Sequence, residues 1–138
     1  MSHALARQAI EEKLLAWSKQ AGNPPVIFGL SKAYPTNALY LHGYLLPALT
    51  TAPYLAADGL NYVGVYQVSI VCNPDQPIGN AENIVNKLSD LFMVDSLLEQ
   101  GGFSGIVIEP VNQGPTIVEA SKYTVPVSFR YRGTVDLP

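Results

Sequence analysis

Two histidines and one cysteine are the residues of this sequence best suited to catalysis or metal binding. His3 falls in the first turn of a predicted helix, where we expect it to be solvated. His42 lies between tyrosines on the outer face of a predicted strand, and a lone histidine so placed more often packs or contacts a partner than reacts. The histidines and the cysteine share no ligand spacing, so the sequence predicts no metal site.

Cys72 ends a predicted strand and has no basic residue beside it in the sequence. A reactive thiol needs positive charge nearby, so we expect Cys72 to behave as a small buried hydrophobe. A single cysteine excludes an intramolecular disulfide and suits a reducing compartment such as the cytoplasm.

Two other motifs could do chemistry but lack the spacing for it. Glu11 and Glu12 are adjacent on a predicted helix and point in different directions, so they cannot share a proton. The run QGGFSG at residues 100–105 lacks the Lys-Ser/Thr ending of a phosphate loop, and its glycines more simply end a helix. No acid, base and nucleophile converge, so we expect neither catalysis nor a cofactor.

Composition places the chain among globular proteins with a surface poor in charge. It has 138 residues, 48% hydrophobic and only 14% charged, against about 25% charged in an average soluble domain. This length predicts one domain over residues 1–138. The net charge is −3 with scattered lysines and arginines, which disfavours nucleic-acid binding. The N-terminus resembles no signal peptide, and the most apolar run is too short to span a bilayer.

The first half of the chain predicts one helix and two long strands. Apolar residues at three- and four-residue steps predict a helix over residues 2–20, followed by a short extended piece, PPVIF. Residues 39–45 alternate, with leucines on one face and Tyr40, His42 and Tyr44 on the other, which is typical of a half-buried strand. Residues 62–72 are apolar on both faces, so this strand needs a neighbour on each side.

The second half predicts another helix and two more strands. Asn80 is a suitable cap for a helix that runs to Phe92, and a further turn ends at Gly101. Strands follow at residues 105–109 and 123–132, and Pro126 places the last of them at an edge or at a bulge. The order predicts an α+β fold: a mainly antiparallel four- to five-stranded sheet with two α-helices packed on one face.

A fifteen-residue connector, residues 47–61, joins the two long strands and is longer than a hairpin needs. It carries leucines and Tyr54 beside a single acid, Asp58, which is too apolar for a disordered linker. We expect it to be an assembly element whose contacts change when the chain meets its neighbours.

The 42 residues from Ala33 to Pro74 contain one charged side chain, Asp58. A solvated hairpin normally carries several charges that discourage association. Tyrosine is enriched at the centres of protein interfaces because it is apolar with one polar end. Two helices cover only one face of a sheet, so the second face is expected to contact another subunit. The predicted interface residues are Tyr40, His42, Tyr44, Leu49, Tyr54, Leu55, Tyr62 and Tyr66.

The whole pattern resembles the tail terminator-like proteins of long-tailed bacteriophages and prophages. The resemblance rests on the opening MSHALARQAIEEKLLAW, the central YVGVYQVSIVCNPDQPIGNAENIVNKLSDLF and the closing YTVPVSFRYRG. It implies a structural protein that forms a ring, typically a hexamer, on the head-proximal end of a tail tube. Such a ring stops tube polymerisation and joins the head, so the implied partners are further copies, the tube protein and a neck protein.

Two other readings stay open at this point. A neck, head-completion or tail tube protein would share ring formation by small α+β domains. A small-ligand binding domain or enzyme would use a pocket beneath the connector, with His42 and the tyrosines as polar anchors.

Overall fold

The protein is a curled mixed sheet that wraps around two helices. The computed structural model describes residues 2–20, 22–29, 39–51 and 59–136. The helices are α1 (Ser2–Ser18) and α2 (Ile78–Leu91). The strands are β1 (Val26–Phe28), β2 (Leu39–Thr51), β3 (Gly59–Cys72), β4 (Leu97–Gln100), β5 (Phe103–Val107), β6 (Asn112–Gln113), β7 (Ile117–Val118) and β8 (Tyr123–Asp136).

Helix α1 forms because one stripe of its surface is apolar at helical spacing. Ala6, Ile10, Leu14 and Trp17 are all buried, and they recur at three- and four-residue steps. Beyond the helix end, the side chain of Asn23 donates to the carbonyl of Trp17 at 2.8 Å. The same carbonyl also accepts from the Gln20 amide at 3.1 Å, so the Asn23 bond joins the segment after α1 to the last helical turn.

Helix α2 begins earlier and ends sooner than the sequence predicts. It starts at Ile78 after Pro77, so Asn80 is not its cap but lies in the first turn. The predicted further turn to Gly101 is wrong. The chain reverses at Asp95, whose φ of 71° is in the left-handed region, and the next residues form β4. Asp is one of the few residues that tolerates this conformation.

The described strands form one sheet in the order β1-β2-β3-β8-β5-β4, with β6 and β7 paired to β8 beside β5. The β1–β2 pair is parallel and the other pairs are antiparallel. The prediction of four to five strands is therefore wrong, although the α+β class is right. The strands that were missed are β4, β6 and β7, which have two to four residues, too few to show a period in the sequence.

The predicted edge position of β8 is also wrong, because β3 and the short strands flank it on both sides. Pro126 is tolerated in this central strand for a local reason. Its carbonyl accepts a hydrogen bond from the Gly114 amide at 2.8 Å, between the places where β6 and β7 pair with β8. The proline nitrogen faces the same side and cannot donate back to Gly114, and the ladder is interrupted there, between β6 and β7.

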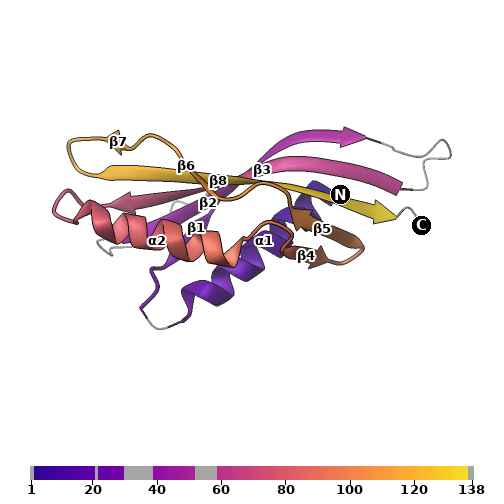
Figure 1. Cartoon of the computed structure of the whole chain (residues 1–138), viewed down its shortest axis with the longest axis horizontal. Coiled ribbons are helices and arrows are strands. Elements are labelled where there is room, and N and C mark those ends of the chain that lie inside the picture. Colours follow the sequence, from indigo (N-terminus) through magenta and orange to yellow (C-terminus); the bar gives the residue numbers. More distant parts are fainter. Residues whose placement is uncertain (1, 21, 30–38, 52–58, 137–138) are drawn as a thin grey trace.

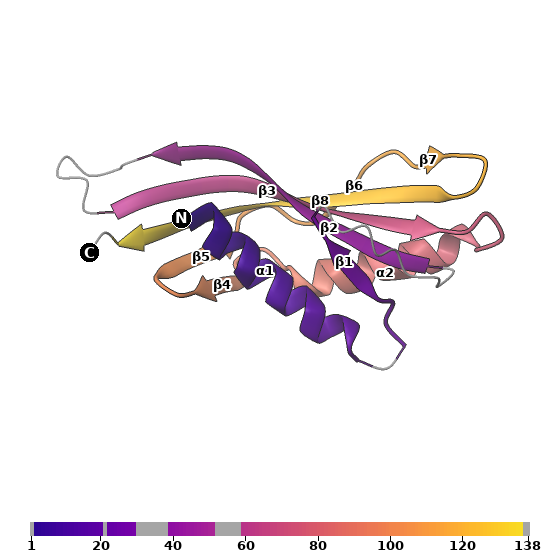
Figure 2. The same ribbon diagram turned by 180° about the vertical axis from the view of Figure 1, so that it is seen from behind.

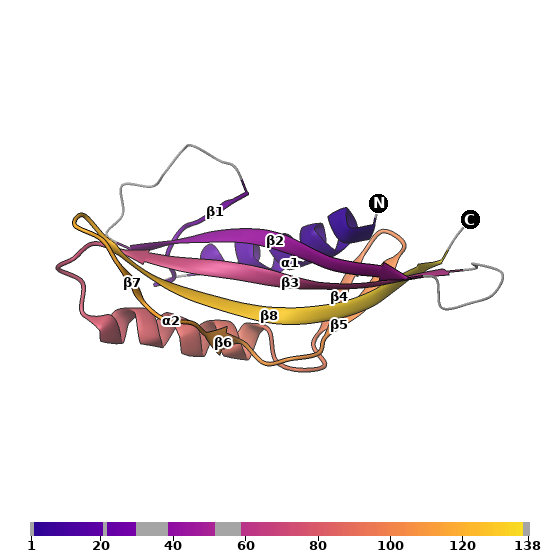
Figure 3. The same cartoon turned by 90° about the horizontal axis from the view of Figure 1, so that it is seen from above.

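The strands β2 and β3 extend into most of the expected connector. They pair from Leu39–Cys72 to Thr51–Asn61, with a bulge between Pro47 and Leu49. Residues 52–58 lie outside the described residues. What the sequence presents as a loop is therefore mainly a long antiparallel hairpin, which projects beyond the helices (Figure 3).

The core lies between the helices and one face of the sheet (Figure 1). Alternate residues of β3 and β8 point into it, including the fully buried Tyr66, Ile70, Val125 and Tyr131. The strands β5 and β4 turn below β8, toward the level of the helices, as Figure 2 shows from behind. The sheet thus closes partly around α1.

Three aromatic rings in this core lie over glycines of a neighbouring strand. A Cβ atom would approach the Tyr66 ring if placed at Gly43 and the Tyr131 ring if placed at Gly64, in each case to 2.5 Å from the hydroxyl oxygen. A third ring, Phe103, fills the space above Gly133 in the same way. The missing side chains make room for large rings inside a tightly curled sheet.

Candidate interaction surface

No described helix covers the face of the sheet opposite α1 and α2, where Ser69 and Val71 are buried and the other residues are half-buried or exposed. The pairing register places alternate residues of β2, β3 and β8 on it. We call this surface the outer face and define it by Tyr40, His42, Tyr44, Leu46, Val63, Val65, Gln67, Ser69, Val71, Thr124, Pro126, Ser128, Arg130 and Arg132. Figure 3 looks onto the three long strands, with both helices beyond them.

Polar side chains on the outer face already bond to one another. Gln67 Nε2 donates to the Tyr44 hydroxyl at 2.8 Å, and that hydroxyl lies 3.2 Å from Ser69 Oγ. His42 Nε2 donates to the Gly29 carbonyl at 2.6 Å, and the imidazole meets the Tyr44 ring edge-on at 5.4 Å. A partner could cover these groups without leaving them unpaired, which removes the usual cost of burying polar atoms.

The outer face carries two charged residues, both on β8. Arg130 Nε lies 3.3 Å from Glu109 Oε1, outside hydrogen-bond geometry, and both side chains are about half exposed. Arg132 is exposed and forms no ion pair with the other described residues. The β2 side of the face therefore consists of tyrosine, histidine and leucine without charge.

Two of the predicted interface tyrosines point into the core instead. Tyr66 is completely buried, and its hydroxyl donates to Glu11 Oε2 at 3.1 Å, while Arg7 pairs with the same carboxylate at 2.8 Å. Burial, followed by the negative charge of Glu11, raises the pKa of Tyr66 far above its usual range. Tyr62 is 8% exposed and packs edge-on against His3 at 4.8 Å. Neither ring is placed to contact a neighbour.

The other predicted interface residues fall into two groups. Tyr40, His42 and Tyr44 are half-buried on the outer face and lie side by side along β2. Leu49 belongs to β2, but its side chain is outside the described part of the chain, as are Tyr54 and Leu55 altogether. Sequence reasoning missed Leu46, which is 48% exposed and continues the same row.

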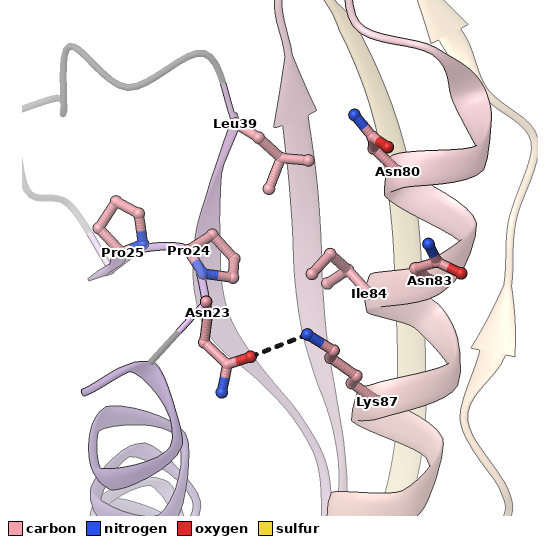
Figure 4. A pocket seen from close by; sticks show the side chains of 9 residues that line it. Asn23, Pro24, Pro25, Leu39, Asn80, Asn83, Ile84 and Lys87 are labelled. Atoms are coloured by element: carbon pink, nitrogen blue, oxygen red, sulfur yellow. Dashed lines mark hydrogen bonds between the residues drawn. The ribbon is translucent and has the colours of Figure 1, made fainter. Parts of the chain in front are cut away.

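A polar cavity of about 490 Å³ lies between α2 and the segment before β1 (Figure 4). Asn80, Asn83 and Lys87 line it from the helix, and Lys87 Nζ donates to Asn23 Oδ1 at 3.1 Å. The described lining contains no carboxylate, histidine, cysteine or hydroxyl side chain. The described lining therefore offers no hydroxyl or thiol nucleophile and no carboxylate base, and its one amine, Lys87, bonds to Asn23.

A second cavity of about 590 Å³ lies beside the middle of β2, where β1 ends. Its lining includes Arg7, Glu11, His42, Tyr44 and Leu45. These polar groups are already engaged, because Arg7 pairs with Glu11 and His42 bonds to a backbone carbonyl. The lining surface that stays exposed in this cavity is mostly apolar, so the cavity is an apolar recess beside the outer face.

The remaining candidates for chemistry take structural positions. His3 Nδ1 lies 2.7 Å from the Tyr131 hydroxyl, and Cys72 is buried, which raises the pKa of its thiol. Among the described residues, no group of three or more histidine, cysteine or acidic side chains could hold a metal ion. None of the helices described here is long and apolar enough to cross a membrane.

Comparison with known proteins identifies the family. The chain matches the family model described as phage tail terminator protein over residues 6–131. Twenty chains of solved structures match, and one of them is 31% identical, with a TM-score of 0.80 over 100% of this chain and 99% of its own. Among curated proteins no match was found. The chain therefore belongs to the phage tail terminator family and is a protein of the bacteriophage tail.

Proposed function

We propose that the chain is a structural tail completion protein that assembles into a ring on the head-proximal end of a tail tube. The ring stops tube polymerisation and offers a surface for joining the head. The partners are further copies of the chain, the tube protein and a neck protein. Assembly takes place in the host cytoplasm, and the role requires no catalysis, cofactor or nucleic-acid recognition.

The uncovered outer face is the observation that carries this proposal. Its β2 side is free of charge among the described residues and presents Tyr40, His42, Tyr44 and Leu46. Burying such a surface against protein contributes roughly 25 cal/mol per Å² of apolar area. Since the polar atoms nearby are already hydrogen-bonded to one another, little of that gain is lost to desolvation.

A ring also requires the contact to be heterologous. Different surfaces of two copies must meet, and the rotation between them must close after a fixed number of copies. The family resemblance implies six copies, a number that mass measurement of the purified ring tests directly.

Negative-stain imaging of the purified protein, alone and mixed with tail tubes, tests the function. We expect closed rings, and tubes that carry the ring at one end and no longer elongate. Continued growth into tubes would identify a tube subunit instead. Rings that bind the head side but never the tube would identify a neck protein.

The ligand-binding alternative has a separate test. A specific small ligand raises the melting temperature by mass action, so a thermal-shift screen with common metabolites and metal ions detects one. We expect no shift, because the described linings of both cavities lack a converging catalytic set.

A further inference from the structure

The sheet ends in two different edges whose backbone groups lack partners among the described residues. One is the part of β2 beyond β1, and the other is β4, at the opposite end of the strand order. An unpaired edge is a template for another strand unless it is blocked or covered.

On β2, the register shows which backbone groups face outward. The Leu41 amide donates to Pro25, and the Gly43 carbonyl accepts from Gly29, so odd-numbered residues face the β1 side. Leu45 is the next odd-numbered residue of β2, and it lies beyond the last pair between β1 and β2, which is Phe28 with Gly43. Its amide and carbonyl point to the side of the 590 Å³ cavity that Leu45 helps to line. Pro47, which has no amide hydrogen, ends this edge two residues later.

On β4, the same argument selects Leu97 and Glu99. The Ser96 carbonyl accepts from Val107, so even-numbered residues face β5 and odd-numbered residues face away. Leu97 is 66% exposed, and Glu99 is exposed as well. In a parallel pairing, these two outward residues of β4 would bond to the amide and the carbonyl of Leu45, the one outward residue that lies between the end of β1 and Pro47.

The side chains along the two edges are complementary. The segment from Leu88 to Ser121 contains five acids and no lysine or arginine, and Glu99 and Asp95 belong to it. The recess beside β2 is mostly apolar, and its cation is Arg7, whose side chain is 41% exposed while that of Glu11 is 13% exposed. An incoming β4 would place apolar Leu97 near an apolar recess and acidic Glu99 near the exposed part of the Arg7 guanidinium, which also pairs with Glu11.

We infer that β4 of one copy pairs in parallel with the edge of β2 of a second copy, in the stretch between β1 and Pro47 where no described residue pairs with β2. The two edges differ, so the contact is heterologous and repeats around a ring. This inference rests on the proposed function and names the surfaces that join its subunits. His42 and Tyr44 then lie at the joint, next to the recess that receives Leu97.

Two variants at position 99 separate the contribution of the backbone amide to the contact from that of the side chain. Glu99→Pro removes an outward amide together with the carboxylate side chain, whereas Glu99→Ala removes the side chain beyond Cβ but keeps the amide, and Pro is compatible with an edge position. We expect Glu99→Pro to raise the apparent dissociation constant of the ring about tenfold or more over Glu99→Ala, a difference typical of a lost interface contact. Sedimentation gives the constant, and circular dichroism checks the fold.

Disulfide cross-linking gives a second measurement that does not depend on proline being tolerated. Leu46 and Leu97 are both exposed, and parallel pairing of β4 with β2 would put their side chains on the same face of the joined sheet, so cysteines at these positions can meet. Oxidation of Leu46→Cys/Leu97→Cys should yield a covalent ladder of oligomers, as should Leu46→Cys/Glu99→Cys in the neighbouring register. Leu46→Cys/Val118→Cys is the control, since Val118 is 79% exposed on β7.

The outcomes separate this inference from the proposed function. If the wild-type chain forms rings but the cysteine pairs at the two edges cross-link no better than the control, the edges are not the joint. Equal dissociation constants for the two folded Glu99 variants would overturn it as well. If the wild-type chain neither assembles nor caps tubes, the proposed function itself fails.

Discussion

The ring of Tyr66 lies over Gly43 of the adjacent strand, so that a Cβ atom at residue 43 would stand 2.5 Å from the tyrosine hydroxyl oxygen and 3.1 Å from Cε1. The same hydroxyl donates to Glu11 on α1. Tyr66 of β3 therefore packs over β2 and links both strands to α1 by a hydrogen bond.

Gly43→Ala should destabilise the protein by about 1 to 3 kcal/mol, the usual cost of overpacking a closed core. The added methyl group forces the buried ring away from its place and weakens its bond to Glu11. Urea unfolding measures the change. Tyr66→Phe removes the closest contacting atom, so the double variant should lose less than the sum of the single changes. Gly79→Ala, with no atom within 4 Å of the added Cβ, is the matched control.

Tyr44→Lys should abolish assembly and leave a folded monomer. Tyr44 is half-buried on the outer face, and a lysine there would put an unpaired charge in the proposed contact, at a cost of about 3 to 5 kcal/mol. Light scattering reports particle size, and circular dichroism reports the fold. Val118→Lys, on exposed β7, should assemble normally. Rings of full size from folded Tyr44→Lys would remove this part of the face from the interface.

Alkaline pH should destabilise the protein partly through Tyr131. Burial raises the pKa of Tyr131 to about 12 from a usual value of 10.0. Between these values the unfolded chain has released a proton that the folded chain retains, so the free energy of unfolding falls as pH rises. Burial also raises the pKa of Tyr66 and of Tyr123, so Tyr131→Phe should reduce the fall without removing it. Urea unfolding across this pH range tests it, and an unchanged slope in the variant contradicts the assignment.

Cys72 should react slowly with thiol reagents in the native protein. The side chain is 1% exposed, and burial raises the pKa of the thiol, so both access and the thiolate fraction are low. We expect labelling at least about tenfold faster in urea than in buffer. A native rate equal to the unfolded rate would show that the end of β3 opens readily.

The sequence predicts the faces of β2 correctly because a single alternation decides them. Leu41 turns inward, and Tyr40, His42 and Tyr44 turn outward, as the pattern indicates. The pattern cannot decide the faces of β3, since both are apolar. Tyr66 points inward, where its hydroxyl donates to Glu11 on a helix far away in the sequence. The residues close to Tyr66 in the sequence do not indicate this partner.

The short strands were beyond prediction for a related reason. β6 and β7 have two residues each and exist only because β8 lies beside them. β4 follows a reversal of the chain at Asp95. The sequence gives no sign of this reversal, because the leucines on either side of it keep a helical spacing. The absence of lysine and arginine from residues 88–121 was visible in the sequence. Only the structure shows that this acidic segment includes β4, at one edge of the sheet.

The position of β8 in the sheet also governs when the protein can fold. It lies between β3 and β5, and it pairs with β3 along fourteen consecutive residues from Tyr123 to Asp136. Fifty residues separate the facing ends of β3 and β8, so their contacts are long-range and slow to form. Until β8 pairs, β3 keeps an open edge and one side of the core is uncovered. A chain whose β8 is not yet in place is therefore vulnerable to aggregation, and a copy becomes competent for assembly only after this strand has paired.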